Sequence, residues 1–508
     1  MARRLARAGR RVVVLESGKA VFDQHSQSLN TIVDIGGRYT RPMDGRYRGL
    51  GGSSMRWGGR LVPIYASDAS ERRHIGAEGW PFSYSELEGY LSEIEDEFGV
   101  AHGAFGAPAV ESVGLGDVFP SRDEDFTSRL AKWINYRNCN LATLWGRELR
   151  NSENLAIFLD ATVNEIHVDA DAGRLKALEA HSLSGGSVRV AADHFIIAAG
   201  TIESTRLLLW LDRQAGDQVF GRGSVLGRYF QDHLKAEVAT VMRPDQDLGN
   251  HLFGYHYIKG TRRSLHLDFT QQAQEKLRTS SAFVYPAMDL SSSGLARIKA
   301  VARSLQSGQF NMWEVGALLG ELPLVAQAAY WRFAKRQVFM PSTVRIGMQI
   351  AIEQRPKWDN HIALATETDR FGVPKVALDW SPQPEDEACF RAVANRLRAY
   401  WSRAGLDRSF PLSWLIDPQD TSGAFCDAAQ PYAHPSGSTR MGTDPATSVV
   451  DPDLVCHSVH NLSVVSASVF PNAGSANPTL TILQLALRHA DWLLARVRRP
   501  LAVTSVSA

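Results

Sequence analysis

Two residues near the C-terminus have the types and surroundings that a proton-transfer reaction needs. His434 opens the run HPSGSTRMG, and Asn477 comes immediately before Pro478 and Thr479. A neutral histidine can accept a proton near pH 7, and an asparagine amide can donate a hydrogen bond to an oxygen that becomes negative. Each residue also has an ordinary interpretation, as a core histidine or as a helix N-cap. From the residues alone, both interpretations of His434 and of Asn477 stay open.

The residues around Asn477 also mark the start of a long helix. A polar residue stands at the cap position and Pro478 stands in the first turn. The first amides of a helix have no partner within the helix, so they favour a nearby partial negative charge. Residues 462–465 read as a short buried strand. A strand and a loop between the two candidates allow the second to return to the first.

A glycine-rich run, GLGGSSMRWGG, occupies residues 49–59. Glycine at this density lets backbone amides approach a ligand closely, as an anionic diphosphate or the edge of a flavin requires. The alternative is a flexible surface loop, although such a loop seldom contains a Met-Arg-Trp sequence. Gly51, Gly52, Ser53 and Trp57 are therefore candidate binding residues.

The first residues predict the second half of a dinucleotide-binding unit. Residues 2–8 have helical spacing, Gly9 is placed for a left-handed helix cap, and residues 11–15 form a β-branched strand that closes on Glu16. In a dinucleotide-binding βαβ unit, a carboxylate at this strand end holds the adenosine ribose. The alternative is any α/β protein with an exposed glutamate. The sequence contains no G-x-G-x-x-G turn of the kind that opens such a unit.

The order strand, glycine turn, helix then recurs. Residues 155–168 and 188–200 predict sheet strands, the second ending on Gly200, and residues 202–210 predict a helix. This order indicates a doubly wound α/β sheet. A capping box that begins at Ser83 predicts a further helix as far as Phe98, with an apolar face that belongs to the core.

From about residue 236 to 427 the pattern changes to alternating strands. Strands at 345–353 and 376–380 are examples, and they predict a second domain built on an antiparallel sheet. Within it, residues 293–340 read as a basic helical arm. We interpret this arm as a lid or packing segment, and contact with a membrane surface or a partner is the alternative.

Composition and charge exclude several classes of protein. The 508 residues contain 55 Lys and Arg against 54 Asp and Glu, without a basic block that could bind nucleic acid. No apolar run reaches the roughly 18 residues that cross a bilayer, so we expect a soluble protein. The four cysteines are scattered, and no cluster of potential ligands has metal-binding spacing. We therefore expect no disulfide, no metal and a reducing, cytoplasmic compartment.

Several motifs, in this order, resemble the glucose-methanol-choline (GMC) oxidoreductase family, from Met1 to about residue 496. They are VVVLESG at 12–18, GLGGSSMRWGG, GWPFSYSELEGY at 79–90, FIIAAGTIESTRLLL at 195–209, LGRYFQDH at 226–233, and the C-terminal pair HPSGSTRMG and ANPTLT. The C-terminal pair is most similar to the pyranose oxidase branch, which includes bacterial sugar and glycoside oxidases. The resemblance implies that His434 and Asn477 are the active-site histidine and asparagine.

The resemblance also implies FAD as the cofactor. We expect Glu16 at the ribose, the strand near Val163 at the adenine, and the backbone of Gly51, Gly52 and Ser53 beside the cofactor. The amides of Pro478 and Thr479 would face the flavin. The expected set is completed by Trp57, Gly200 and Ser468.

Three departures from the family pattern bear on this cofactor. Pyranose oxidases carry the flavin covalently on a histidine just before the tryptophan of the glycine-rich motif, and Arg56 stands there in this chain, which implies non-covalent FAD. Many members place an aspartate against the cofactor where this chain has Ser466. The family also opens with the G-x-G-x-x-G turn. We therefore expect the reading frame to extend upstream of Met1 by roughly 20 to 30 residues, and a truncated remnant is the alternative.

The implied fold is α/β with two domains. An FAD-binding, Rossmann-like domain would contain residues 1–64, 151–232 and 430–500. A substrate domain with an antiparallel sheet would contain residues 65–150 and 233–429.

The implied activity is oxidation of a secondary alcohol, a ring hydroxyl of a sugar or glycoside, to a ketone by hydride transfer to the flavin. A flavin-containing lyase of the same fold and a non-catalytic remnant are the alternatives. The expected partner is a small-molecule alcohol or sugar. The electron acceptor and a homo-oligomeric state are left open by the sequence.

Overall fold

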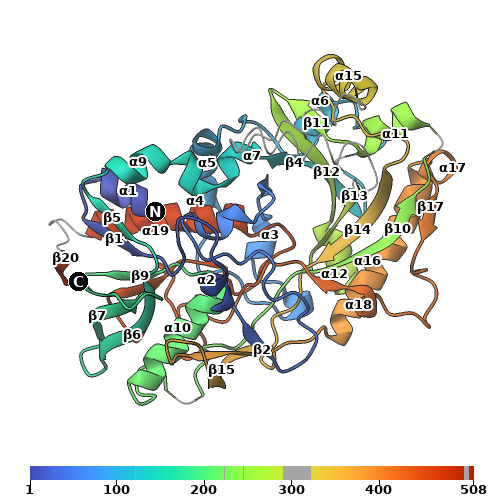
Figure 1. Cartoon of the computed structure of the whole chain (residues 1–508). Coiled ribbons are helices and arrows are strands. Elements are labelled where there is room, and N and C mark those ends of the chain that lie inside the picture. Colours follow the sequence, from blue (N-terminus) through green and yellow to red (C-terminus); the bar gives the residue numbers. More distant parts are fainter. Residues whose placement is uncertain (121, 222, 244, 290–321, 497–502, 508) are drawn as a thin grey trace.

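The computed structural model describes residues 1–120, 122–221, 223–243, 245–289, 322–496 and 503–507. Two lobes lie side by side (Figure 1). The first lobe contains the N-terminal strand, short parallel strands and the C-terminal helix, and the second is built on a large antiparallel sheet. This is the α/β architecture that the sequence predicts.

Two pairs of parallel strands form the centre of the first lobe. The strand β1 (Val12–Leu15) pairs with β5 (Leu155–Phe158), and β9 (Phe195–Ile197) pairs with β19 (Leu462–Val464). All three residues of β19 are buried, as the sequence predicts. In the described part of the chain the two pairs are not hydrogen-bonded to each other, so the doubly wound sheet is present as two separate pairs.

An antiparallel sheet covers one side of these pairs. It contains β6 (Thr162–Asp169), β7 (Arg174–His181), β8 (Ser187–Ala192) and, on its edge, β20 (Val503–Ser507). The predictions of single strands at 155–168 and 188–200 were therefore wrong, because each range holds two strands that belong to different sheets. In the first range the chain turns at Asp160, which has a φ of 54°. A left-handed aspartate leaves no mark in an apolar pattern.

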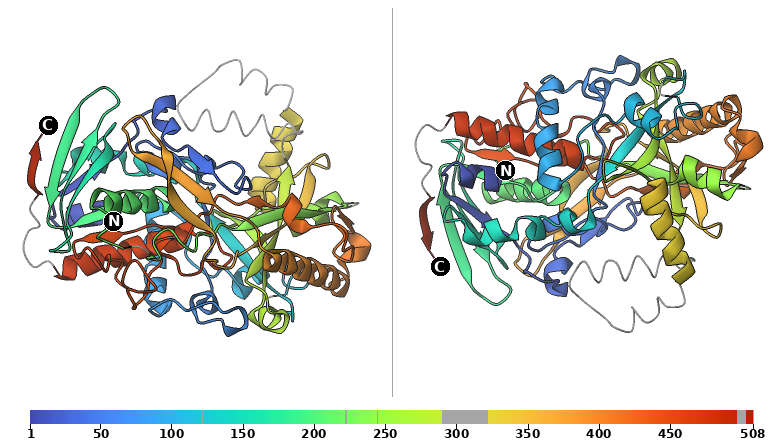
Figure 2. Two further views of the ribbon diagram at one scale, coloured as in Figure 1. Left: turned by 90° about the horizontal axis from the view of Figure 1, so that it is seen from below. Right: turned by 90° about the horizontal axis from the view of Figure 1, so that it is seen from above.

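The N-terminal helix is held to the first lobe by ion pairs. The helix α1 (Ala2–Arg7) lies beside α19 (Thr479–Arg496) in both views of Figure 2. Its arginines face carboxylates, with Arg4 at 2.7 Å from Asp491 and Arg3 at 2.6 Å from Glu97 on α5 (Leu91–Phe98). Gly9 has a φ of +78°, which confirms the predicted left-handed turn between α1 and β1.

The helix that the capping box at Ser83 predicts is broken. The structure has a short α4 (Ser85–Glu88), then Gly89 and Tyr90, then α5. The apolar residues at helical spacing still face the core, since Leu87, Ile94 and Phe98 are buried. The predicted helix from 202 to 210 is present within α10 (Thr201–Gln214).

The second lobe is built on an antiparallel sheet with the strand order β17, β10, β14, β13, β12, β4, β3. A short strand β11 joins β12, and β18 joins β10. The bounds are β3 (Arg60–Leu61), β4 (Phe126–Trp133), β10 (Leu234–Val241), β11 (His256–Ile258), β12 (Thr261–Phe269), β13 (Ala282–Asp289), β14 (Arg345–Ile352), β17 (Leu412–Trp414) and β18 (Gln430–Pro431).

The two faces of this sheet have opposite character, because side chains alternate along each strand. One face packs residues such as Leu267, Val284 and Ile350 into the largest core, together with Phe390 and Leu397 of α16 (Pro384–Arg403). The opposite face carries aromatic and charged side chains, which are described with the site below. The large sheet thus has one core face and one polar face.

A smaller sheet joins distant parts of the chain. It contains β15 (His361–Thr368), β16 (Pro374–Asp379) and β2 (Ile32–Asp34), and β16 and β2 are parallel. The predicted strand at 376–380 is therefore real but lies outside the large antiparallel sheet. Its parallel partner is more than 300 residues away in sequence, a pairing that local patterns do not encode.

The remaining elements are short. They are α2 (Gln24–Ser28), η1 (Gly52–Met55), α3 (Ala66–Ala69), η2 (Arg73–Ile75), α6 (Ala107–Ser112), α7 (Tyr136–Cys139), α8 (Leu141–Leu144), α9 (Gly146–Asn151), α11 (Gln246–Phe253), α12 (Gln271–Leu277), α15 (Leu322–Tyr330), η4 (Trp331–Lys335), α17 (Leu406–Ser409), α18 (Phe425–Ala428) and η5 (Ala467–Val469). Residues 293–321 of the predicted arm lie outside the described residues. The rest of the arm, residues 322–340, begins with α15 and η4. None of the described helices is long and apolar enough to span a membrane.

Candidate active site

His434 and Asn477 are brought together by the fold. His434 follows β18 at the edge of the large sheet, and Asn477 precedes α19 of the first lobe. The side-chain nitrogen Nδ2 of Asn477 lies 3.1 Å from Nε2 of His434. His434 is half-buried, and Asn477 is buried. The structure thus joins the two residues that the sequence singles out.

A second histidine, His233, fixes the protonation of His434. Nε2 of His233 lies 2.6 Å from the carbonyl oxygen of Gly474, which can only accept, so this nitrogen carries a proton. In a neutral ring, Nδ1 of His233 is then an acceptor. It lies 2.9 Å from Nδ1 of His434, which must therefore donate. Nε2 of His434 is left with a free electron pair, which accepts the hydrogen bond of Asn477.

Burial keeps both histidines neutral. It lowers the pKa of His434 well below its usual range, and the nearby His233, Arg60 and Lys235 lower this pKa further. Burial also lowers the pKa of His233 to about 4. Because neither ring is protonated near pH 7, Nε2 of His434 is available as a proton acceptor.

The carbonyl that starts this chain of hydrogen bonds is itself held in place. The amide of Gly474 donates to Glu353 at 2.9 Å, and Glu353 forms a buried two-point ion pair with Arg72 at 2.5 and 2.7 Å. Bidentate pairs of this kind fix geometry as well as charge. The orientation of His434 therefore depends on a buried network that reaches β14.

The backbone around His434 is fixed by a close turn. The amide of His434 donates to Asp232 at 2.9 Å. Gly437 has a φ of +71°, and a Cβ at this position would lie 2.2 Å from the carbonyl oxygen of Tyr229. Only glycine fits this approach. The run HPSGSTRMG is therefore a packed turn that presents His434.

The polar face of the large sheet lies next to His434. The centre of the Tyr432 ring lies 4.6 Å from that of the His434 ring, and the hydroxyl oxygen of Tyr432 accepts a hydrogen bond from Arg60 at 2.7 Å. The other terminal nitrogen of Arg60 lies 3.2 Å from Nε2 of His266. We call this surface the cationic wall, and it consists of Arg60, Trp133, Lys235, Tyr255, Arg262, His266, Tyr285 and Tyr432.

Glu16 joins the strand β1 to the glycine-rich run. Its Oε1 accepts hydrogen bonds from the amides of Gly18 at 2.8 Å and Gly49 at 2.9 Å. Burial raises the pKa of Glu16. The carboxylate therefore holds the run 49–59 against the strand end. A ribose contact at Glu16 stays a prediction.

The other predicted cofactor residues lie on several elements. Gly51 and Gly52 have positive φ and lead into η1 with Ser53, while Gly51 is close to Asn140. Trp57 donates to the carbonyl of Cys139 at 2.9 Å and packs against Phe98, so it anchors the run to the core.

The remaining positions surround the first lobe's strands. Val163 lies on β6, Gly200 ends the turn before α10, and Pro478 and Thr479 begin α19. Ser468 is buried in η5, where its hydroxyl lies 2.6 Å from that of Thr439. The structure thus places each residue, and contact with a cofactor stays a prediction for all of them.

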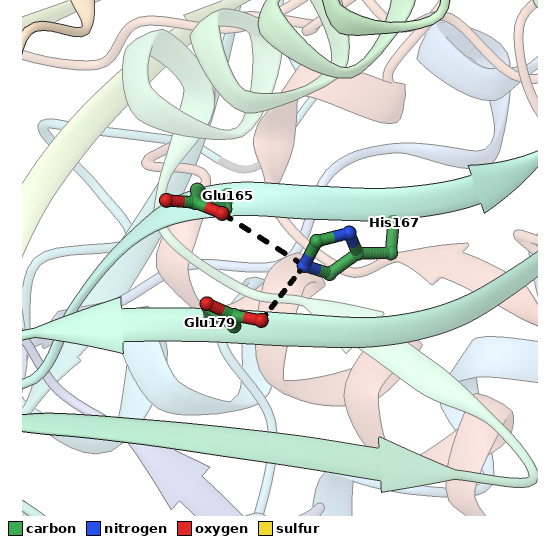
Figure 3. A group of neighbouring side chains, drawn as sticks. All are labelled: Glu165, His167 and Glu179. Carbon is green, nitrogen blue, oxygen red and sulfur yellow. Dashed lines mark hydrogen bonds and ion pairs between the residues drawn. The ribbon is translucent and has the colours of Figure 1, made fainter.

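Strand pairing gathers one group of metal-type ligands that sequence spacing does not show. Glu165 and His167 on β6 lie beside Glu179 on β7 (Figure 3). All three are half-buried. Nε2 of His167 lies 3.0 Å from Glu179, which also pairs with Arg189 at 2.7 Å. These neighbours explain the group as an ion-pair cluster, so the expectation of no metal stays a prediction.

Sequence reasoning missed the roles of His233, Arg72, Glu353 and the cationic wall. The only signal for His233 is its place in LGRYFQDH. The other residues come from strands and loops that are far apart in sequence.

The comparisons with known proteins bear on the family. Residues 356–486 match the family model described as GMC oxidoreductase. This match places the C-terminal part of the chain alongside the GMC oxidoreductases. A relative, paromamine 6'-oxidase of Streptomyces fradiae, is 35% identical over 30% of this chain and 27% of its own length. The 2-methyl-1,2-propanediol dehydrogenase of Mycolicibacterium austroafricanum is 24% identical over 88% of this chain and 81% of its own length.

The solved structures show the fold. The crystal structure of pyridoxine 4-oxidase from Mesorbium loti superimposes with a TM-score of 0.61 and 16% identity, covering 98% of this chain and 97% of that one. The chain therefore shares the fold of this oxidase over nearly its whole length. The first relatives found by sequence match this chain over only about a quarter of their own length.

The described residues fit the family's cofactor, FAD, at its flavin end. Oδ1 of Asn477 is buried and has no hydrogen-bond partner among the described residues. The turn 198–200 is exposed, and a Cβ at Gly200 would meet no atom within 4 Å, so there is room beside it. The helix α19 of 18 residues begins next to Asn477 and offers its first amides.

Proposed function

We propose that this protein is an FAD-dependent oxidoreductase that oxidises a secondary alcohol, a ring hydroxyl of a sugar or glycoside, to a ketone. One observation carries the proposal: His233 holds Nε2 of His434 as a proton acceptor, and Nδ2 of Asn477 lies within hydrogen-bond distance of this same atom. A carbon that loses a hydride becomes a carbonyl only if its hydroxyl proton also leaves. A base at this oxygen therefore lowers the barrier.

Each residue has a separate part in this reaction. The Nε2 atom of His434 takes the hydroxyl proton, and Nδ2 of Asn477 donates to the oxygen as negative charge develops. His233 and the Gly474 carbonyl keep His434 in the reactive tautomer. FAD, when bound, supplies the acceptor for the hydride.

We further propose that FAD is bound without a covalent link. Arg56 stands where the covalent histidine of pyranose oxidases would be, and it is exposed, with its guanidinium 5.3 Å from the ring of Tyr47. A guanidinium cannot form the histidyl bond. Assignment to the pyranose oxidase branch, and the domain boundaries given above, belong to the same proposal.

Anaerobic mixing with candidate alcohols tests the proposed function. The FAD-loaded protein should lose its flavin absorbance with a sugar or glycoside that has a free secondary hydroxyl. A yellow protein that is never bleached would favour a flavin-containing lyase, and a protein that does not retain FAD would favour the remnant.

A further inference from the structure

Three cations of the cationic wall have no carboxylate partner in the part of the chain that the structure describes. Among the described residues, no Asp or Glu lies within 4.0 Å of the charged nitrogens of Arg60, Lys235 or Arg262. Arg60 is buried, and the other two are half-buried. Their contacts with the described residues are with neutral groups, namely His266, a tyrosine hydroxyl and aromatic rings.

Of the carboxylates on this face of the sheet, Asp268 and Glu237 are already neutralised, and Asp289 lies at the end of β13 opposite Arg345. Asp268 on β12 forms a two-point ion pair with Arg129 at 2.6 and 3.0 Å. Glu237 on β10 pairs with Arg345 and accepts a further hydrogen bond from Gln349 at 2.7 Å. The face therefore carries an excess of positive charge on the side of His434.

Contacts with aromatic rings offset only part of the free-energy cost of burying these positive charges. The guanidinium carbon of Arg60 lies 4.9 Å from the ring of Tyr285, and that of Arg262 lies 4.5 Å from the ring of Trp133. Cation–π contacts stabilise a cation more weakly than a paired carboxylate does. A buried cation without a counter-charge is expensive, so such an arrangement favours an anionic ligand.

The ring of Tyr432 lies between the positive charges and His434. Tyr432 contacts His434 on one side, and it accepts from Arg60 through its hydroxyl. Nζ of Lys235 lies 4.6 Å from the centre of the same ring. A ligand whose hydroxyl lies at His434 therefore has cations within reach of its other substituents.

We propose that the substrate carries a carboxylate, as a sugar acid does, and that Arg60, Lys235 and Arg262 bind it while a hydroxyl lies at His434. This assignment rests on the proposed function, which places the hydroxyl. The guanidinium of Arg60 has five N–H donors, and its hydrogen bonds to His266 and Tyr432 use two of them.

Isothermal titration calorimetry of the FAD-loaded full chain tests this proposal. Four probes have the same ring and different charge: glucuronate, methyl glucoside, glucose 6-phosphate and glucosamine. Glucuronate should bind at least about tenfold more tightly than methyl glucoside, since a hydrogen-bonded charge adds that much affinity. The preference should shrink as salt is added. Equal binding of glucuronate and methyl glucoside, or tightest binding of glucosamine, would overturn the proposal.

Variants locate the binding surface. Lys235→Gln and Arg262→Gln, at half-buried positions, should each reduce the preference for glucuronate by about three- to tenfold. Lys176→Gln, which removes an equal charge from the exposed face of β7, should leave it unchanged. An unchanged preference for glucuronate in both wall variants would contradict the assignment. Tighter binding of glucose 6-phosphate than of glucuronate would show that the site is built for a phosphate, and would overturn the carboxylate.

The outcomes separate this proposal from the proposed function. Glucuronate that binds but never bleaches the flavin would contradict the function and support the anion site. Bleaching by a neutral sugar, without competition from glucuronate, would support the function and overturn the anion site.

Discussion

The free electron pair on His434 depends on a chain of hydrogen bonds that begins at a backbone carbonyl. Gly474 sets the proton on His233, and His233 sets the proton on His434. Without an acceptor at its Nδ1, His434 could carry its proton on either nitrogen, and only one of the two tautomers presents a base to the substrate. His233 is therefore a positioning residue in the proposed mechanism.

The His233→Leu variant should slow anaerobic flavin reduction by about 10- to 100-fold, a part of the roughly 10²- to 10⁴-fold that a general base contributes. His233→Asn, which keeps an acceptor oxygen, should recover part of the rate. His194→Leu removes a half-buried histidine beside His489 and Trp492, so it serves as a control and should not slow the reduction. Equal losses in the Leu and Asn variants of His233 would indicate a purely structural role.

Acid precipitation tests the absence of a covalent flavin link. Because Arg56 cannot form a histidyl bond, the yellow colour should pass entirely into the supernatant. The measurement is the flavin absorbance of pellet and supernatant. Colour retained in the pellet would show that another residue carries the flavin.

At the residue scale, sequence could predict the pair His434 and Asn477 but not its surroundings. The pair lies in two motifs that can be read locally. His233 reaches His434 across 201 residues, and Arg60 reaches Tyr432 across 372. Such contacts depend on the pairing of distant strands, which no local pattern specifies.

At the scale of elements, ion pairs join the helices and loops with very different strength. Arg72 precedes η2 and pairs with Glu353 directly after β14, with both side chains at most 5% exposed. Arg4 on α1 pairs with Glu93 and Asp491, with all three side chains at least 29% exposed. Removing one partner of a buried ion pair leaves a buried charge without compensation, whereas solvent screens the charges of an exposed pair.

Arg72→Met should therefore lower the free energy of unfolding by about 3 to 5 kcal/mol. Arg4→Met should lower it by no more than about 1 kcal/mol. Urea unfolding followed by tryptophan fluorescence measures both. Equal losses in the two variants would show that burial does not set the strength of these pairs.

Sequence could predict several of the long elements, but it did not indicate α16, the longest helix of the described residues, and it missed some boundaries. The strand β14 was predicted to within one residue at its end, and the helix α10 begins one residue before the predicted start and continues four residues beyond the predicted end. The split between α4 and α5, and the turn at Asp160, interrupt apolar runs that continue through them. In both places tertiary packing, rather than local propensity, determines where the element stops.

At the scale of the whole molecule, the candidate site lies where the two lobes meet. His434 follows a strand of the large sheet, while Asn477 leads into α19 of the first lobe. Asp232 stands at this junction, where its carboxylate accepts from Tyr39 at 2.7 Å and from the amide of His434. Burial raises the pKa of Asp232 to about 7.

This raised pKa makes stability depend on pH. The folded protein binds the proton of Asp232 more tightly than the unfolded chain, whose carboxyl has a pKa of about 3.9. The contribution of Asp232 to stability should therefore decrease as pH rises from about 4 to about 7 and stay constant above. Asp232→Asn should remove this trend, so the melting temperature of the variant relative to wild type should rise over that range. A constant difference would contradict the raised pKa.

The most direct test of the central claim, that His434 is the base of an FAD-dependent alcohol oxidation, is stopped-flow reduction of the flavin under anaerobic conditions. With a substrate that bleaches the wild-type protein, His434→Ala should reduce its flavin about 10²- to 10⁴-fold more slowly while still binding FAD. Asn477→Ala should lose about 10²-fold, as expected for one oriented donor. A His434→Ala protein that reduces its flavin within about threefold of the wild-type rate would contradict the account, since that loss is far below what a general base contributes.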